Sequence, residues 1–151
     1  MSKVVHPFAH RLVILRDWKS RWFAKDNKYK DFLRTDVLLR EFLEKRLRGS
    51  YVSSIEVERS QKTMRVIIRT SRPGMIIGRS GEAMTKLKND ITKELRRLKI
   101  KMPEELKIDV SEIASPEADA GIVAYMVAEG LEKRLPYRRV LKQTLEKVMQ
   151  T

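Results

Sequence analysis

The residues best suited to chemistry lie in one short stretch, RPGMIIGRSGE, at positions 72–82. Three glycines fall within eight residues, and the last two, Gly78 and Gly81, enclose Arg79 and Ser80. Glycine lets the backbone approach a ligand closely and adopt positive φ at little cost. A glycine turn that opens a helix also presents free N–H groups and the positive end of the helix dipole. The spacing therefore predicts a GXXG loop that binds phosphate, with Arg72 before it and Lys86 after it as further contacts.

The charge of the chain points to the same kind of ligand. Its 151 residues carry 33 Lys and Arg against 20 Asp and Glu, a net charge of +13 and a pI near 10.2. Such a charge favours nucleic acid or an anionic membrane surface. No apolar run approaches the roughly 18 residues of a membrane-spanning helix. The apolar face of the helix after the loop is needed for the core, so we expect no membrane partner.

An enzyme is the least favoured class. The chain has no cysteine, which excludes disulfides and thiolate metal sites. His6 and His10 are four residues apart, but Pro7 lies between them and the helical H-E-x-x-H pattern is absent. The glycine stretch also lacks the Gly-Lys-Ser/Thr ending of a nucleotide-binding P-loop. We therefore expect no catalytic site, no metal and no cofactor. The first residues do not resemble a signal peptide, so the expected compartment is the cytoplasm.

Residues 1–30 form a basic, aromatic amino-terminal arm without a sustained period. Aromatic rings among cations suit stacking on bases and pairing with phosphates. The alternative is that the tryptophans pin the arm onto the domain, because Trp buries much area. Residues 11–16 could form a short strand. The candidate RNA-binding residues of the arm are Lys3, His6, Arg11, Arg21 and Trp22.

Hydrophobic periodicity predicts the elements around the loop. Residues 31–48 read as a core-packing helix with Leu33 on its apolar face, and Thr35 or Asp36 as an inner cap. Residues 54–59 and 64–70 alternate as an antiparallel hairpin. An amphipathic helix at 82–99 with a basic outer face follows the glycine loop, and 106–111 alternates as a third strand.

The carboxyl-terminal part reads as two helices. Ser115 is expected to cap a helix that has Pro116 at its first position, runs to about residue 134 and buries Leu131. A last helix at 137–149 displays three cations at its start, namely Arg138, Arg139 and Lys142. From the residues alone this is a cationic helix end, most often solvated.

The order helix, strand, strand, GXXG, helix, strand over residues 31–111 is that of the bacterial-type (type II) KH module, whose GXXG loop clamps about four nucleotides. It predicts an α+β fold, with a three-stranded mixed sheet and helices packed on one face. In this module the GXXG loop joins two helices, and residues 74–77 would supply the first, very short one. We expect an arm at 1–30, the KH domain at 31–113, and two helices at 114–151 that begin a second domain.

The chain resembles the small-subunit ribosomal protein three family more closely than the fold alone requires. The resemblance rests on the segments KVVHP with Arg11-Leu12, WKSRWF at 18–23, the KH loop, and SPEADA at 115–120 followed by LPYRR at 135–139. It covers nearly the whole chain in the right order. The family continues into strands of a second domain, whereas this chain ends at Thr151.

The resemblance implies binding to small-subunit ribosomal RNA, neighbours among the ribosomal proteins of the subunit head, and a place where messenger RNA enters the subunit. It implies that Arg138, Arg139 and Lys142 line that channel and help to unwind structured messenger. The alternative is a free-standing KH factor that binds RNA in ribosome maturation or transcription.

Overall fold

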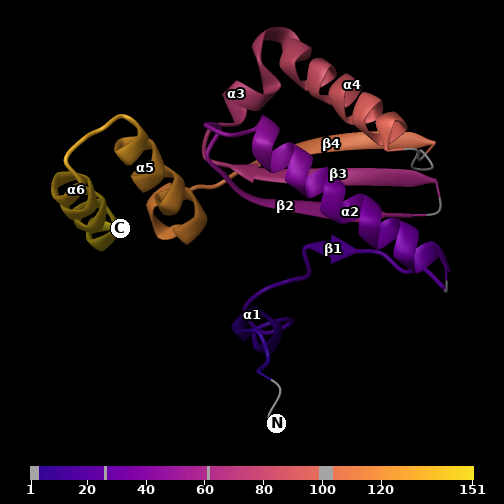
Figure 1. Ribbon diagram of the computed structural model, residues 1–151, viewed down its shortest axis with the longest axis horizontal. Coiled ribbons are helices and arrows are strands. Elements are labelled where there is room, and N and C mark those ends of the chain that lie inside the picture. The colour runs from indigo at the N-terminus through magenta and orange to yellow at the C-terminus, as the bar shows by residue number, and fades with distance from the viewer. Residues whose placement is uncertain (1–3, 26, 61, 99–103) are drawn as a thin grey trace.

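The computed structural model describes residues 4–25, 27–60, 62–98 and 104–151, so Lys3 lies outside it. It confirms the α+β class. A mixed β-sheet has helices α2 (Asn27–Arg46) and α4 (Glu82–Arg97) over one face, and helices α5 (Ala120–Glu132) and α6 (Tyr137–Gln150) beside one end (Figure 1).

The sheet has the strand order β1-β2-β3-β4. Strands β2 (Val52–Arg59) and β3 (Thr63–Thr70) form the predicted antiparallel hairpin. Strand β4 (Glu105–Glu112) lies parallel to β3 and is the predicted third strand. Met64, Val66 and Ile68 alternate inward at 1% exposure or less, so the period-two pattern fixed which face is buried.

A fourth strand, β1 (Ser20–Arg21), was not predicted. It lies parallel to β2, with the Val57 N–H donating to the carbonyl of Lys19 at 2.9 Å. The strand expected at residues 11–16 is wrong. There the backbone closes into a turn in which the N–H groups of Leu15 and Arg16 both donate to the carbonyl of Arg11 at 3.0 Å. The arm begins with a single helical turn, α1 (Pro7–His10).

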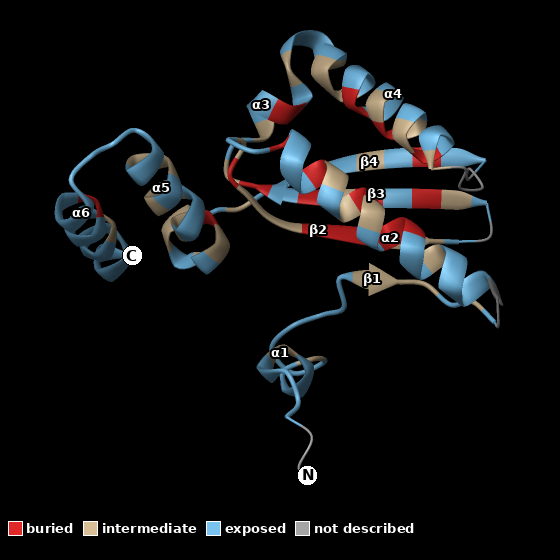
Figure 2. Cartoon of the chain, viewed as in Figure 1, coloured by how far each residue is buried: buried red, intermediate tan, exposed pale blue. Residues whose placement is uncertain are grey.

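The core lies between the sheet and the two helices (Figure 2). Helix α2 buries Leu39 and Leu43, and Leu47 is buried just beyond its end. Leu33 is 46% exposed, contrary to the prediction. Helix α4 buries Leu87, Ile91 and Leu95, which recur at four-residue steps and confirm its amphipathic pattern.

Both predictions of a side chain that caps the amino-terminal end of a helix, Thr35 or Asp36 in one case and Ser115 in the other, are wrong. Thr35 and Asp36 lie inside α2, which starts at Asn27, and both are buried. Pro116–Ala118 forms a short 3-10 turn without a Ser115 side-chain cap. The cap of α5 is Asp119, whose carboxylate accepts from the N–H groups of Gly121 and Ile122 at 2.9 and 3.2 Å. A carboxylate suits that position because the helix start is electropositive.

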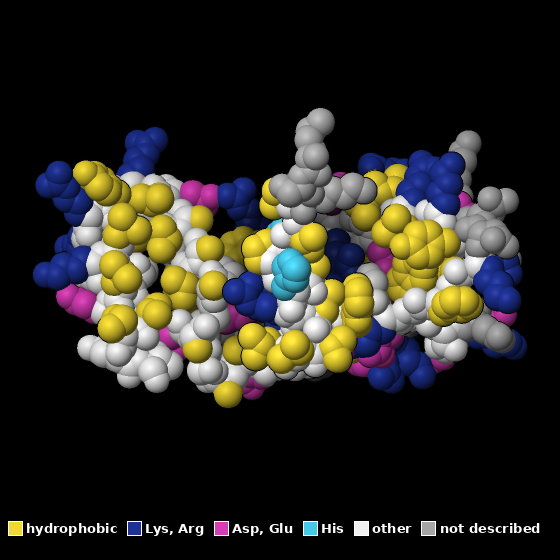
Figure 3. Space-filling view, turned by 90° about the horizontal axis from the view of Figure 1, so that it is seen from below, with side chains coloured by type: hydrophobic (Ala, Val, Ile, Leu, Met, Phe, Trp, Pro, Cys, Tyr) yellow, Lys and Arg dark blue, Asp and Glu magenta, His cyan; other side chains and the backbone are white. Residues whose placement is uncertain are grey.

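Helices α5 and α6 pack closely on each other. A Cβ added at Gly130 would lie 2.8 Å from a methyl carbon of Val140, which is itself buried. Leu131 was expected in the core but is 47% exposed. Apolar side chains gather over this helix pair on the face seen in Figure 3. The exposed apolar residues of the pair and its connection include Leu131, Leu135, Leu141, Leu145 and Met149.

None of the helices in the described residues has the length and apolar content needed to cross a bilayer.

Candidate nucleic-acid interface

The glycine loop joins a one-turn helix, α3 (Pro73–Ile77), to the long helix α4. Helix α3 is anchored by Ile76, which is 3% exposed. The chain then turns through Gly78 at φ 72°, Ser80 at φ 54° and Gly81 at φ 77°. Three positive φ values in four residues bend the backbone sharply, and the two glycines adopt theirs at little cost, whereas the third belongs to Ser80.

Gly78 is required by space as well as by conformation. A Cβ at this position would lie 2.7 Å from Cβ of Ala83 and 3.1 Å from its backbone nitrogen. Gly81 has open space around it, so only its positive φ favours glycine there. The loop therefore packs directly on the first turn of α4, and it leaves Arg79 and Ser80 exposed at its tip.

The cations near the loop are available for a ligand. Within the described residues, no carboxylate lies within ion-pair distance of Arg79 or Lys86. Lys86 is exposed one turn into α4, and exposed cations continue along that helix at Lys88, Lys93 and Arg96. Helix α4 starts at Glu82, and its N-cap residue, Gly81, supplies no side-chain cap. Exposed cations and a helix start therefore face the solvent together.

Arg72 stands at the start of α3 and is exposed. Its guanidinium lies over the ring of Tyr51, 4.1 Å from the ring centre. Its backbone N–H donates to the hydroxyl of Thr70 at 3.0 Å. Arg72, which precedes the glycine loop, is thus held by the aromatic ring of the residue just before β2.

The start of the arm, with α1, lies beyond the β1 edge of the sheet, whereas α3 and α4 lie toward the β4 edge (Figure 1). His6 caps α1 through its Nδ1, which accepts from the N–H of Phe8 at 3.1 Å. Arg11 donates to the carbonyl of Pro7 at 3.2 Å. Both side chains are exposed, so they remain open to a ligand.

Trp22 and Arg21 make their contacts within the chain. The indole N–H of Trp22 donates to the buried carboxylate of Asp36 at 2.6 Å, and its ring packs on Tyr29 and Phe32. Arg21 pairs with Glu56 and Glu58, each at 2.8 Å. Burial alone would lower the pKa of Arg21, but its hydrogen bonds to Glu58 and Glu56 outweigh burial and raise it.

Arg138, Arg139 and Lys142 form a third group at the start of α6, far along the chain from the loop. All three are exposed. Arg138 donates to the hydroxyl of Tyr137 at 3.0 Å, and Lys142 lies 4.0 Å from the carboxylate of Glu146. The expected cations therefore lie in three places, at the KH loop, on the arm and on α6.

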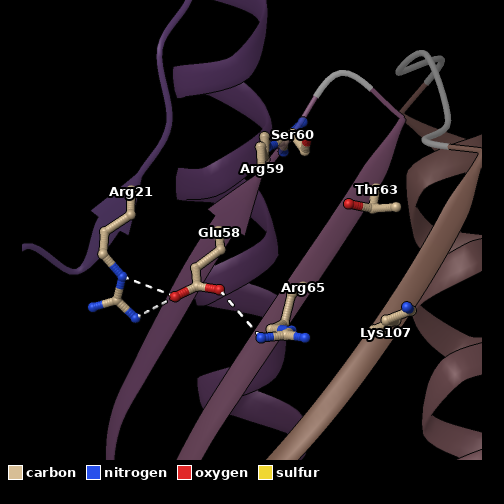
Figure 4. Close-up of a pocket in the computed structure, with 7 residues that line it drawn as sticks. All are labelled: Arg21, Glu58, Arg59, Ser60, Thr63, Arg65 and Lys107. Atoms are coloured by element: carbon tan, nitrogen blue, oxygen red, sulfur yellow. Dashed lines mark hydrogen bonds and ion pairs between the residues drawn. The ribbon is translucent and has the colours of Figure 1, made fainter.

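The open face of the sheet also carries cations, but they are paired. A depression of about 310 Å³ lies where β3 begins, the opposite end from the loop (Figure 4). Glu58 lies between Arg21 and Arg65, and Arg65 also pairs with Asp109 at 3.1 Å. Arg69 pairs with Glu56 at 3.0 Å. Because each carboxylate offsets a neighbouring cation, we assign no anion site to this face.

The structural roles of Asp36 and Tyr51 were not predicted from the sequence. Asp36 is fully buried and holds the arm through Trp22 and Ser20, at 2.6 and 2.9 Å. An acid on the apolar face of a helix was the available signal. Tyr51 contacts both Arg72 and Glu129, and nothing in its sequence neighbourhood indicated this.

Groups of three or more potential metal ligands do not occur among the described residues.

Comparisons with known proteins agree with the fold. The family described as "KH domain" matches residues 38–118. Small ribosomal subunit protein uS3 of Solibacter usitatus is 42% identical over 99% of this chain and 41% of its own length. The uS3 proteins of Koribacter versatilis and Desulfatibacillum aliphaticivorans are 42% and 40% identical over 99% of this chain, which spans 63% and 65% of their lengths. The chain therefore belongs to the KH-domain family and, by its similarity along almost its whole length, to the family of small ribosomal subunit protein uS3.

Proposed function

We propose that this protein is a structural component of the small ribosomal subunit that binds ribosomal RNA, and that it works in the cytoplasm within the ribosome. The observation that carries the proposal is the glycine loop. Three positive φ values expose Arg79 and Ser80 at the head of a basic helix. A backbone bent in this way can follow a phosphate chain closely, as the GXXG loops of KH modules do.

The loop, with Arg72 and Lys86, is the proposed centre of RNA binding. We also propose that helices α5 and α6 belong to the start of a second domain. Lys3, His6 and Arg11 are proposed as a second set of RNA contacts on the arm. For Arg21 and Trp22 we propose a positioning part, because their polar atoms already bond to Glu58 and Asp36. They would hold the arm so that its other cations meet ribosomal RNA.

Arg138, Arg139 and Lys142 are proposed to contact messenger RNA where it enters the subunit. Their exposure and their common place at the start of α6 support this role. We propose that they bind the phosphates of the strand electrostatically. If so, R138E/R139E should slow translation of a messenger with a stable hairpin more than that of an unstructured one. If the variant translates the two messengers at the same relative rates as the parent, the channel role is contradicted.

A resident protein and a transient factor differ in how they leave the subunit. We expect the tagged protein to co-sediment with small subunits through a wash at high salt. The loop and the arm contact the subunit at two places, and both must release at once before the protein can leave. A free-standing KH factor in ribosome maturation or transcription would wash off. Loss of the whole protein from the subunit fraction in that wash would therefore favour the alternative.

A further inference from the structure

Tyr51 occupies an unusual position between the KH loop and the carboxyl-terminal helices. It stands just before β2 with φ 50°, a conformation that L-residues rarely adopt, and its side chain is 8% exposed. Hydrogen bonds join its backbone segment to the end of the neighbouring strand, β3. The N–H of Ser71 donates to the carbonyl of Tyr51 at 3.3 Å, and the hydroxyl of Thr70 donates to the carbonyl of Ser50 at 2.6 Å.

One face of the Tyr51 ring holds the guanidinium of Arg72 at 4.1 Å from its centre. A cation over an aromatic face is attracted by the negative charge of the ring π-system. Arg72 is long and exposed, so without the ring its side chain would sample many rotamers. The ring therefore preorganises the cation that precedes the GXXG loop.

The hydroxyl of the same side chain donates to the carboxylate of Glu129 on α5. Glu129 also accepts from Lys133 at 2.5 Å. The hydrogen bond to Glu129, together with burial, raises the pKa of Tyr51, so the hydroxyl stays a donor at neutral pH. The hydrogen bonds from Lys133 and Tyr51 lower the pKa of Glu129, so the acceptor stays ionised.

In the part of the chain that the structure describes, two other polar links hold α5 to the KH domain. The hydroxyl of Ser53 donates to the carboxylate of Asp119 at the start of α5, and Arg48 pairs with Glu132 at its end. Neither link touches the glycine loop. Of these three links among the described residues, the Tyr51–Glu129 bond in the last turn of α5 is the one whose tyrosine also contacts Arg72, the cation that precedes the glycine loop.

We propose that Tyr51 is a positioning residue that joins the KH loop to the helix pair, presenting Arg72 with its ring and orienting α5 with its hydroxyl. The role of Arg72 rests on the proposed RNA-binding function, whereas the orientation of α5 does not. The cations at the start of α6 and the loop are then held in one spatial relation, so that a single RNA strand or two adjacent strands meet both.

The orientation is measurable without RNA. Because the chain has no cysteine, the double variant K93C/K147C accepts spin labels on α4 and α6 alone. Pulsed electron spin resonance on the full chain should give one narrow distance distribution. Y51F keeps the ring and removes the hydroxyl, and E129Q keeps the size of the side chain but replaces the charged acceptor with a weaker neutral one. Each should broaden the distribution, whereas the control Y29F should leave it narrow. An unchanged distribution in Y51F and E129Q would overturn the link to α5.

The presentation of Arg72 is tested with single-stranded RNA fragments from the small-subunit RNA. Y51L should weaken binding about twofold to fivefold, the range expected for an exposed cation–π contact. The effect of R72Q should shrink in the Y51L background, because the ring acts through Arg72. If the two effects multiply independently, the presentation of Arg72 by Tyr51 is wrong.

The two arms of the test separate the failures. If R72Q leaves RNA affinity unchanged, both the proposed RNA contact of Arg72 and its presentation by Tyr51 are overturned. The spin-label distances would still decide the hold on α5. Circular dichroism of each variant checks that the sheet and helices remain. If Y51L unfolds, Y51F and E129Q still test the orientation of α5. The presentation of Arg72 is then tested by R72Q and Y51F: R72Q should weaken RNA binding and Y51F should not, because the phenylalanine ring still holds Arg72.

Discussion

Replacing Asp36 with alanine should release the amino-terminal arm and destabilise the domain. The carboxylate is fully buried, and Arg59, whose side chain is 7% exposed, donates to it from Nε and a terminal nitrogen at 3.0 and 2.8 Å. The other carboxylate oxygen accepts from the Trp22 indole at 2.6 Å and the Ser20 hydroxyl at 2.9 Å. One side chain therefore joins α2, β2 and the arm.

The size of the effect follows from what the substitution leaves behind. Removing one partner of a buried ion pair costs about 3–5 kcal/mol, because the other charge stays buried without compensation. That is a large share of the roughly 5–15 kcal/mol that stabilises a typical domain. Replacing both charges, as in D36L/R59M, should recover most of the loss, since no charge is then stranded.

Urea unfolding followed by circular dichroism measures the free energy of unfolding of both variants. In a W18F background the fluorescence of Trp22 reports the arm alone, because the chain has two tryptophans. In D36A we expect a red-shifted emission and faster tryptic cleavage between residues 16 and 25. D36L/R59M should regain stability but keep the arm loose. A loss below about 1 kcal/mol in D36A, the worth of an ordinary hydrogen bond, would refute this account of the buried cluster.

Two further predictions concern the loop and the helix pair. G78A should lower the free energy of unfolding by about 1–3 kcal/mol, the cost of a strained φ, because its Cβ would also lie 2.7 Å from that of Ala83. The matched control G74A, with nothing within 4 Å of its added Cβ, should change stability little, and equal losses in urea would contradict the packing argument. Because Lys133 and Tyr51 lower the pKa of Glu129 below its ordinary value of 4.5, its contribution to stability should be full above pH 4.5 and vanish as the pH falls through the lowered pKa. Unfolding curves of the parent and E129Q should therefore converge in acid, and a constant difference across that range would show that Glu129 does not supply it.

Periodicity predicted the hairpin, the third strand and the amphipathic helix because each element buries one face against the same core. It could not predict β1. Two residues are too few to show a period, and β1 is held by Asp36 and Glu58, which lie 16 residues from Ser20 and 37 from Arg21. The prediction of the cap of α5 was wrong for a different reason. Ser115 followed by Pro116 fits the local rules for a helix start, but Asp119 also contacts Ser53, 66 residues away.

The same distinction applies to the candidate interface. The glycine loop was predictable because positive φ and close approach select glycine in the local sequence. Tyr51 was not, because its partner Glu129 is 78 residues away and only the folded chain brings the two together. Trp22 was interpreted as an RNA contact or a pin, and its bond to Asp36 supports the second interpretation.

The central claim, that the loop binds RNA phosphate, is tested most directly by the salt dependence of RNA affinity. We would measure binding of the parent, R79D/S80D and the control K147D/Q150D to single-stranded small-subunit RNA over a series of salt concentrations. The control makes the same charge change at the end of α6. The account predicts that only the loop variant loses affinity by about tenfold or more and that its log–log slope falls by about 0.7 for each lost phosphate contact. Equal affinity and slope in the parent and R79D/S80D, or equal losses in both variants, would contradict it.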